Sequence, residues 1–202
     1  MQGAKDLLGQ LARNALDRGQ VVDAGVQATG AAVIGPQATP GLCAVVARRQ
    51  CQFGAVAAVA AAVMSCVKAG DHVVCADKPY SWTRTLLGNY LTNFGVEVSY
   101  VVGSDAAGFE AAIRPTTKLI YLESPNSLTF ELQDIRAVSG VAKKHNIPVA
   151  IDNSYNSPLN QSPIELGADL VIHSATKYLN GHTDVIAGVV AGSHQRIAKM
   201  MA

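Results

Sequence analysis

Short apolar runs alternate with amphipathic stretches from residue 69 onward, and this alternation constrains the fold more than any other feature of the chain. The apolar runs are residues 72–76, 96–102, 118–122, 147–151, 169–173 and 185–191. Between them, residues 82–94, 106–113 and 132–145 carry apolar side chains at helical spacing. Short, nearly continuous apolar strands that alternate with helices predict an α/β fold, with a mostly parallel sheet and helices on both faces.

Polar residues cluster just past the ends of four of these runs. Ala76 is followed by DKPYSWT, Tyr121 by LESPNSLTFELQD, Ala150 by IDNSYNSP, and Ile172 by HSATKYLNGHTD. In sheets of this kind, ligands bind outside the carboxyl ends of the strands. We therefore expect four loops from one edge of the sheet to converge on one site.

The composition excludes several classes of partner. Of the 202 residues, 16 are basic and 15 acidic, which gives a formal charge of +1, and only 5% are aromatic. Without a polybasic block, neither nucleic acid nor an anionic membrane surface is an expected partner. The longest apolar run, residues 54–67, ends at Lys68 and is shorter than the roughly 20 residues of a membrane-spanning helix.

Charged residues near the N-terminus, among them Lys5, Asp6 and Arg13, stand where a signal peptide has apolar residues, so we expect a cytoplasmic protein. The four cysteines have no CxxC spacing and lie in apolar segments, which predicts buried free thiols; they are Cys43, Cys51, Cys66 and Cys75.

The first fifty residues have a less regular pattern. Residues 6–16 have the spacing of an amphipathic helix, whereas residues 19–41 are rich in Gly, Ala and Pro and have no clear period. We therefore divide the chain into a partly helical N-terminal segment, residues 1–50, and an α/β domain, residues 51–202.

Lys177 is the first candidate for chemistry. A lysine at the end of a core strand is expected to be buried there, which favours the neutral amine that can form a Schiff base. The alternative is an ordinary surface cation. Asp152 also ends an apolar run, and a carboxylate there is costly unless it meets a cation such as the pyridinium nitrogen of pyridoxal phosphate (PLP). The alternative for Asp152 is a helix or turn cap made by the sequence DNS.

Three further features fit a phosphorylated aromatic ligand. If the segment is extended, Ser174 and Thr176 direct their hydroxyls to the side opposite Lys177, where they suit a phosphate. Gly54 permits close backbone approach, and Ala55 begins a predicted helix whose free amides suit an anion; any glycine before an Ala-rich helix looks the same. Tyr80 could stack on a planar ring, or it is simply a turn tyrosine after Pro79.

Taken together, these residues resemble the Cys/Met-metabolism family of PLP enzymes, the transsulfuration group of cystathionine lyases, cystathionine synthases and methionine lyase. The motif that carries the resemblance is GADLVIHSATKYLNGHTDVIAG, residues 167–188. KAGDHVV, PTTKLIYLESP and VAIDNSYNSP support it, and the resemblance covers roughly residues 54–190.

The resemblance implies the large domain of the aspartate-aminotransferase type, with PLP as the cofactor. The family's Schiff-base lysine falls on Lys177, its ring-nitrogen carboxylate on Asp152 and its stacking tyrosine on Tyr80. Its phosphate-binding hydroxyls fall on Ser174 and Thr176, and its phosphate-binding amides on Gly54 and Ala55.

The chain also departs from the family pattern. QFGA, residues 52–55, replaces Ser-Ser-Gly-Met, and Ser127 stands where the family has an Asn beside the phenolic oxygen of the cofactor. Residues 44–53, AVVARRQCQF, read unlike the strand that the family has there. Full members of the family are longer, so we expect a truncated chain without the small C-terminal domain and its substrate-carboxylate arginine.

The resemblance implies a PLP-dependent C–S lyase or transsulfuration enzyme. It would act on cystathionine, methionine or homoserine-ester type substrates by β/γ-elimination or γ-replacement, and it would form a homodimer or homotetramer. The alternative is a non-catalytic or truncated homologue that keeps the fold. A nucleotide-binding module lacks the expected glycine motifs, and a zinc site using His173 and His182 lacks a third ligand at a suitable spacing.

Overall fold

The computed structural model describes residues 31–34, 42–48, 54–102, 105–182 and 184–202, with side chains from residue 54 onward. The predicted helix at residues 6–16 lies outside the described residues, as do the side chains of Cys43 and Cys51. Of the two described thiols, Cys75 is buried and Cys66 is half-buried, and both are free cysteines.

The described residues form one eight-stranded sheet with the order β1-β2-β8-β7-β6-β5-β3-β4. Five neighbouring strands, β4, β3, β5, β6 and β7, are parallel, and β8, β2 and β1 continue the sheet antiparallel. The predicted α/β fold with a mostly parallel sheet is confirmed. The strands are β1 (Ala31–Ile34), β2 (Leu42–Arg48), β3 (His72–Ala76), β4 (Glu97–Val101), β5 (Thr117–Glu123), β6 (Val149–Asp152), β7 (Leu170–Ser174) and β8 (Ala187–Ser193).

The sequence interpretation of residues 44–53 was wrong for the part that the structure describes. The segment up to Arg48 forms β2, which pairs antiparallel with the whole of β8, from Leu42 opposite Ser193 to Arg48 opposite Ala187. The β-branched pair Val45 and Val46 favours a strand, and β8 supplies the hydrogen-bond partners, which the local sequence does not reveal. The domain boundary at residue 50 stays a prediction, and the sheet includes strands from both sides of it.

The helical segments are α2 (Gly54–Met64), α3 (Ser81–Thr85), η1 (Leu86–Tyr90), η2 (Leu91–Phe94), α4 (Ala106–Ala112), α5 (Ile135–Lys144), α6 (Ser157–Asn160), η3 (Pro163–Leu166), η4 (Ala175–Leu179) and α7 (His194–Met201). The predicted helices at 106–113 and 132–145 are α4 and α5. The predicted helix at 82–94 is composite, since an α-helical turn passes into a π-helical and then a 3-10 turn, and Gly95 ends it with φ 77°.

Side-chain caps fix the start of several helices. The Asp134 carboxylate accepts a hydrogen bond from the Ala137 amide at 2.9 Å and begins α5, and Asp105 begins α4 in the same way through Ala107. Ser193 caps α7 by accepting from the Arg196 amide at 3.3 Å. These contacts satisfy amide groups that a first helical turn leaves without partners.

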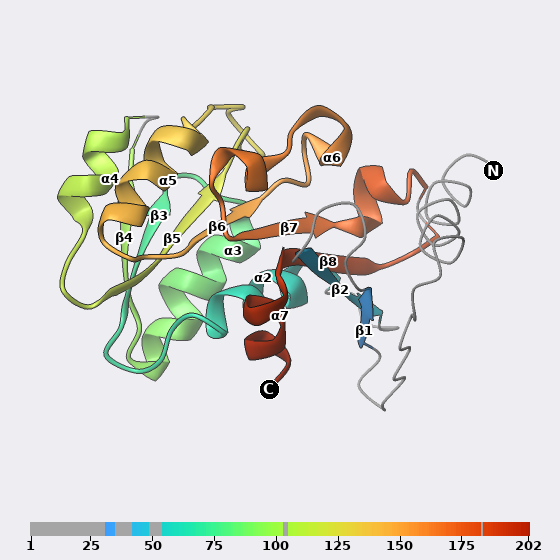
Figure 1. Cartoon of the computed structure of the whole chain (residues 1–202), viewed down its shortest axis with the longest axis horizontal. Helices are drawn as coiled ribbons and strands as arrows, with labels where there is room; N and C mark the ends of the chain where they lie inside the picture. Colours follow the sequence, from blue (N-terminus) through green and yellow to red (C-terminus); the bar gives the residue numbers. More distant parts are fainter. Residues whose placement is uncertain (1–30, 35–41, 49–53, 103–104, 183) are drawn as a thin grey trace.

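The sheet separates two apolar cores (Figure 1). On one face, buried residues of α2, the α3–η2 segment and α7 pack against the sheet; we call this the α2 face. On the other, buried residues of α4 and α5 pack against it. The strand residues on the α2 face are Val73, Cys75, Leu119, Tyr121, Ala150, Leu170, Ile172 and Val190.

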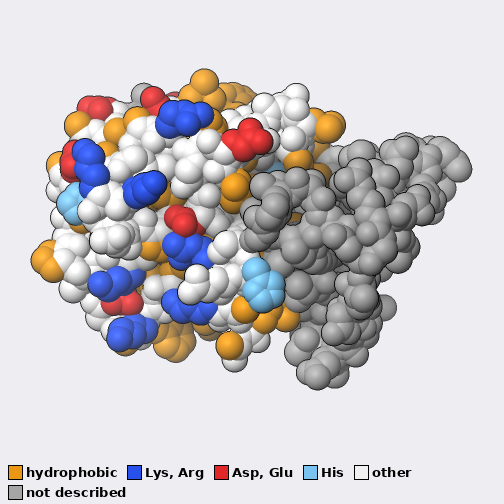
Figure 2. All heavy atoms as spheres, in the orientation of Figure 1, with side chains coloured by type: hydrophobic (Ala, Val, Ile, Leu, Met, Phe, Trp, Pro, Cys, Tyr) orange, Lys and Arg blue, Asp and Glu red, His pale blue; other side chains and the backbone are white. Residues whose placement is uncertain are grey.

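The surface carries both signs of charge. On the face that Figure 2 shows, basic and acidic side chains are interspersed among the described residues. Within the described part of the chain, no helix is long and apolar enough to cross a membrane, and the longest of them, α2, has 11 residues.

Candidate functional site at the carboxyl edge of the sheet

Three neighbouring strands end with polar side chains on the same face of the sheet. Side chains alternate along a strand, so Glu123, Asp152 and Ser174 lie on the α2 face with Tyr121, Ala150 and Ile172, two residues before them. In the register, Glu123 lies opposite Asp152, and Asp152 lies opposite Ile172. All three side chains are buried. The loops that follow β5, β6 and β7 therefore start next to one another at this edge of the sheet, as predicted.

Glu123 joins the loops that follow β3 and β5. Its Oε2 accepts a hydrogen bond from the Tyr80 amide at 2.7 Å, and its Oε1 accepts one from the Ser127 amide, also at 2.7 Å. Tyr80 immediately precedes α3, so this carboxylate fixes the start of that helix relative to the end of β5. Sequence reasoning missed Glu123 as a site residue, although its position directly after a buried apolar run was a usable signal.

The two neighbouring carboxyl groups are both harder to ionise than usual. Burial, and then the charge of Asp152, raise the pKa of Glu123 to about 7, while the amides of Tyr80 and Ser127 oppose the shift. Burial also raises the pKa of Asp152, against hydrogen bonds from Ser154. A cation that reached this position would lower the cost of keeping Asp152 ionised.

Ser154 connects the β6 loop to the end of β7. The Asp152 Oδ1 atom accepts a hydrogen bond from the Ser154 amide at 2.9 Å, and the Ser154 Oγ accepts one from the Ser174 amide at 2.5 Å. The sequence DNS therefore does form the local turn that was the alternative interpretation of Asp152. The same turn also holds the carboxylate on the face that Glu123 and Ser174 share.

The segment around Lys177 differs from the sequence prediction. The strand β7 ends at Ser174, and Ala175–Leu179 form a π-helical turn in which Lys177 departs from helical geometry (φ −87°, ψ −119°). Lys177 is exposed, so the expected burial of its side chain was wrong. The argument from an extended segment was also wrong, because residues of a helical turn do not alternate between two sides.

Thr176 holds the Lys177 turn against β8. Its Oγ1 accepts a hydrogen bond from the Ala187 amide at 3.0 Å and lies 3.3 Å from the Ala187 carbonyl oxygen, to which it donates. The hydroxyl proton of Thr176 therefore has an acceptor within the chain. A ligand oxygen that took this proton would replace the bond to Ala187.

Gly54 lets the first turn of α2 approach β8 closely at Ala187. A Cβ at Gly54 would lie 2.8 Å from backbone atoms of Ala187, and a Cβ at Gly188 would overlap the Gly54 carbonyl oxygen. Close packing of α2 on β8 thus supplies a reason for Gly54 that needs no ligand. It also puts the first turn of α2, with Ala55, beside the Ala187 residue that Thr176 contacts.

Two donors in the β5 loop are buried, the Nδ2 of Asn126 and the Oγ of Ser127. The Asn126 Nδ2 has no hydrogen-bond partner, whereas the Ser127 hydroxyl lies close enough to Glu123 to oppose the rise in its pKa. The Oδ1 of Asn126, by contrast, accepts bonds from the Thr129 amide and hydroxyl at 3.0 and 2.9 Å. Tyr80, whose amide bonds the Glu123 carboxylate near this loop, is 39% exposed, so part of the residue is open to solvent.

His173 lies on the opposite face of β7 from Ser174, so it does not belong to this group of residues. It is buried, its Nδ1 has no hydrogen-bond partner, and burial lowers its pKa to about 4. Among the described residues, no group of three His, Cys, Asp or Glu side chains could hold a metal ion.

The chain was compared with protein families and known proteins. A family model described as Cys/Met metabolism PLP-dependent enzyme matches residues 46–202. An L-methionine gamma-lyase from Porphyromonas gingivalis is 48% identical over 146 residues, which are 72% of this chain and 37% of that protein. A cystathionine beta-lyase, MetC, from Staphylococcus haemolyticus is 43% identical over 141 residues, 70% of this chain and 36% of that protein.

Among solved structures, metB from Corynebacterium glutamicum matches with a TM-score of 0.71 and 35% sequence identity, covering 74% of this chain and 39% of that one. The chain therefore spans well under half the length of the relatives it matches.

Proposed function

Because the chain belongs to the Cys/Met metabolism family of PLP-dependent enzymes, we propose that it performs PLP-dependent lyase or transferase chemistry on sulfur amino acids. The substrates would be cystathionine, methionine or homoserine-ester type amino acids, converted by β/γ-elimination or γ-replacement. The observation that carries the proposal is the buried Asp152 carboxylate at the edge where Lys177, Tyr80 and Ser127 also lie.

The residues of this edge fit PLP. Asp152 is a buried carboxylate of raised pKa, and a protonated ring nitrogen would give it the cationic partner that makes its ionised form favourable. Asn126 offers a buried donor without a partner, and Ser127 offers a buried hydroxyl beside it; both suit a phenolic oxygen. The first turn of α2, at Gly54 and Ala55, lies close to Thr176 through Ala187, and amides at such a helix end suit a phosphate together with Ser174.

The chemistry of the bound cofactor is to withdraw electrons from the substrate carbon that loses a proton. Lys177 would hold the cofactor covalently, and its amine would serve as the general base for the proton on the substrate Cα. Asp152 would hold the proton on the ring nitrogen. Tyr80 would stack on the ring and exchange a proton with the leaving group at its phenolic oxygen.

The exposure of Lys177 favours a second candidate, a homologue that binds PLP without turnover. A general base is most effective where water is excluded, and the described residues leave Lys177 open. Ser127 also favours this candidate, because its side chain is shorter than the Asn of the family pattern.

Turnover separates the two candidates. The purified chain is loaded with PLP, and keto acid formed from L-methionine and from cystathionine is measured beside a Lys177→Ala variant. Keto acid from the wild-type chain alone supports the enzyme. If PLP binds but neither amino acid gives keto acid, and a homoserine ester with L-cysteine gives no cystathionine, the non-catalytic homologue replaces it.

We also propose that the chain self-associates as a homodimer or homotetramer through the aromatic residues near Lys177. Phe130, Tyr155 and Tyr178 are 55%, 44% and 63% exposed, and their rings contact in series at centroid distances of 5.2 and 6.2 Å. Exposed apolar clusters of this kind mark association surfaces. Light scattering of the wild type and of a Tyr178→Ser variant tests this, since a monomeric wild type contradicts it. We further propose a cytoplasmic location, which the free thiols Cys66 and Cys75 support.

A further inference from the structure

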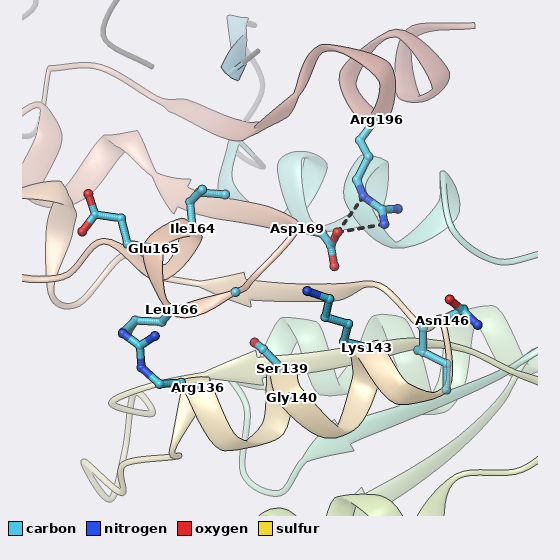
Figure 3. Close-up of a pocket in the computed structure, with 12 residues that line it drawn as sticks. Arg136, Ser139, Gly140, Lys143, Asn146, Ile164, Glu165, Leu166, Asp169 and Arg196 are labelled. Carbon is cyan, nitrogen blue, oxygen red and sulfur yellow. Dashed lines mark hydrogen bonds and ion pairs between the residues drawn. The ribbon is translucent and has the colours of Figure 1, made fainter. Parts of the chain in front are cut away.

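A cavity of about 590 Å³ lies between α5 and η3, away from the carboxyl edge of the sheet (Figure 3). Asn146 and Ile147, just before β6, and Asp169, just before β7, help to line it, so it lies near the amino ends of these strands. It therefore lies at the opposite edge from Asp152 and Lys177.

One wall of the cavity is a stripe of α5. Arg136, Ser139 and Lys143 follow one another at intervals of three and four residues, the spacing that places side chains on one side of a helix. Figure 3 shows Ser139 between the two basic residues along the helix. Gly140 belongs to the same stripe, and beyond its chain neighbours and the backbone of its own helix no described atom lies within 4 Å of the position that a Cβ would take there.

The acidic groups at the cavity do not neutralise this stripe. The Asp169 Oδ1 atom pairs with the Arg196 Nη2 at 2.8 Å, and its Oδ2 accepts from the Val149 amide at 2.9 Å. Glu165 also lines the cavity, but it forms no ion pair with Arg136 or Lys143. Within the described part of the chain, neither Arg136 nor Lys143 has an ion-pair partner.

The Ser139 hydroxyl also points to a ligand at this site. The residue is only 6% exposed, and its Oγ has no hydrogen-bond partner. It faces Gly167, where φ is 102° and a Cβ would lie 2.8 Å from the Ser139 Cβ. A buried hydroxyl without an acceptor is costly for the folded state, so an acceptor supplied from the cavity would be favourable.

We propose that this cavity binds a small oxyanion, a phosphate or carboxylate group, between Arg136 and Lys143. The two cations supply charge-assisted hydrogen bonds, and the bound oxygen gives the Ser139 hydroxyl the acceptor it lacks. This site is independent of the proposed PLP chemistry, because none of its residues lies at the carboxyl edge.

The test is an amide NMR titration of the 202-residue chain with inorganic phosphate and, separately, with succinate, both at constant ionic strength. We expect saturable shifts of the Gly140 and Gly167 amides with at least one of the two anions. Shifts that saturate with phosphate alone identify a phosphate site. Shifts that saturate with succinate alone identify a carboxylate site. Phosphate bound at the α2 end would not move these two amides.

Lys143→Gln is expected to weaken binding about ten-fold or more, as the loss of a charge-assisted bond implies. Lys144→Gln is the matched control, because Lys144 is the next residue of α5 and lies outside the cavity, 3.7 Å from Glu110. Ser139→Ala is expected to weaken binding several-fold. Unsaturable shifts, or equal weakening by Lys143→Gln and Lys144→Gln, would overturn the proposal.

Discussion

Replacing Glu123 by Gln tests whether the buried carboxylate pair has the electrostatics described above. Glu123 is 5% exposed, and its pKa is raised from 4.5 to about 7, first by burial and then by the charge of Asp152. Gln has nearly the same shape and never ionises. It can accept only one of the two amide bonds, from Tyr80 or Ser127, and so resembles the protonated acid more than the carboxylate.

The direction in which stability changes with pH follows from proton binding to Glu123. Between pH 4.5 and about 7, the folded chain holds a proton on Glu123 that the unfolded chain has released, so the stability of the wild type falls as pH rises through this window. At about 1.4 kcal/mol per pKa unit, the full loss is about 3 kcal/mol. The Gln variant has no such loss, so its stability relative to the wild type should rise by about that amount between these pH values and then level off.

Urea unfolding at a series of pH values, followed by the fluorescence of Trp82, measures this difference, since the chain has a single tryptophan. Subtracting the two free energies of unfolding removes the contributions of groups that both proteins share and that do not interact with residue 123. Glu165→Gln, which also removes one carboxylate but at an exposed position, is the matched control. The reasoning would be refuted if the difference in free energy of unfolding between Glu123→Gln and the wild type did not change with pH. It would also be refuted if the wild type gained stability relative to the variant as pH rises.

Two further predictions concern packing and burial. Gly188→Ala should destabilise the chain by about 1–3 kcal/mol or more, because its Cβ would overlap the Gly54 carbonyl oxygen. Gly140→Ala, where a Cβ would meet open space, should stabilise it by about 0.5–1 kcal/mol. Urea unfolding midpoints of the two variants that shift in the same direction would contradict this. The His173 imidazole, whose pKa burial lowers to about 4, should stay neutral down to about pH 5 in an NMR titration. The stability that it contributes above pH 6.5 is lost as pH falls toward 4, and a midpoint above pH 6 would contradict the burial argument.

The parallel strands could be predicted from the sequence because both of their faces are buried. That arrangement leaves continuous apolar runs, and the run at residues 72–76 coincides with β3 (His72–Ala76). The convergence of the loops followed from topology, since the carboxyl ends of neighbouring parallel strands meet at one edge. β2 could not be predicted in this way, because its pairing with β8 joins segments more than 100 residues apart.

The local geometry of the site depends on tertiary contacts that the sequence does not reveal. The bond from Thr176 to Ala187 and the close packing of Gly54 on β8 determine how the Lys177 turn lies. The exposure of Lys177 depends on what covers η4, and no local pattern encodes that. Glu123 ends its strand as Asp152 does, so the same signal applied to it, but its bonds to the Tyr80 and Ser127 amides depend on the fold and are not visible in the sequence.

The most direct test of the central claim is to identify the residue to which PLP becomes attached. The chain is incubated with PLP, reduced with borohydride and digested, and the labelled peptide is sequenced. The account predicts a visible absorption band before reduction and a label on Lys177 alone. A label on another lysine, or no band and no label, would contradict the assignment of this edge as a PLP site.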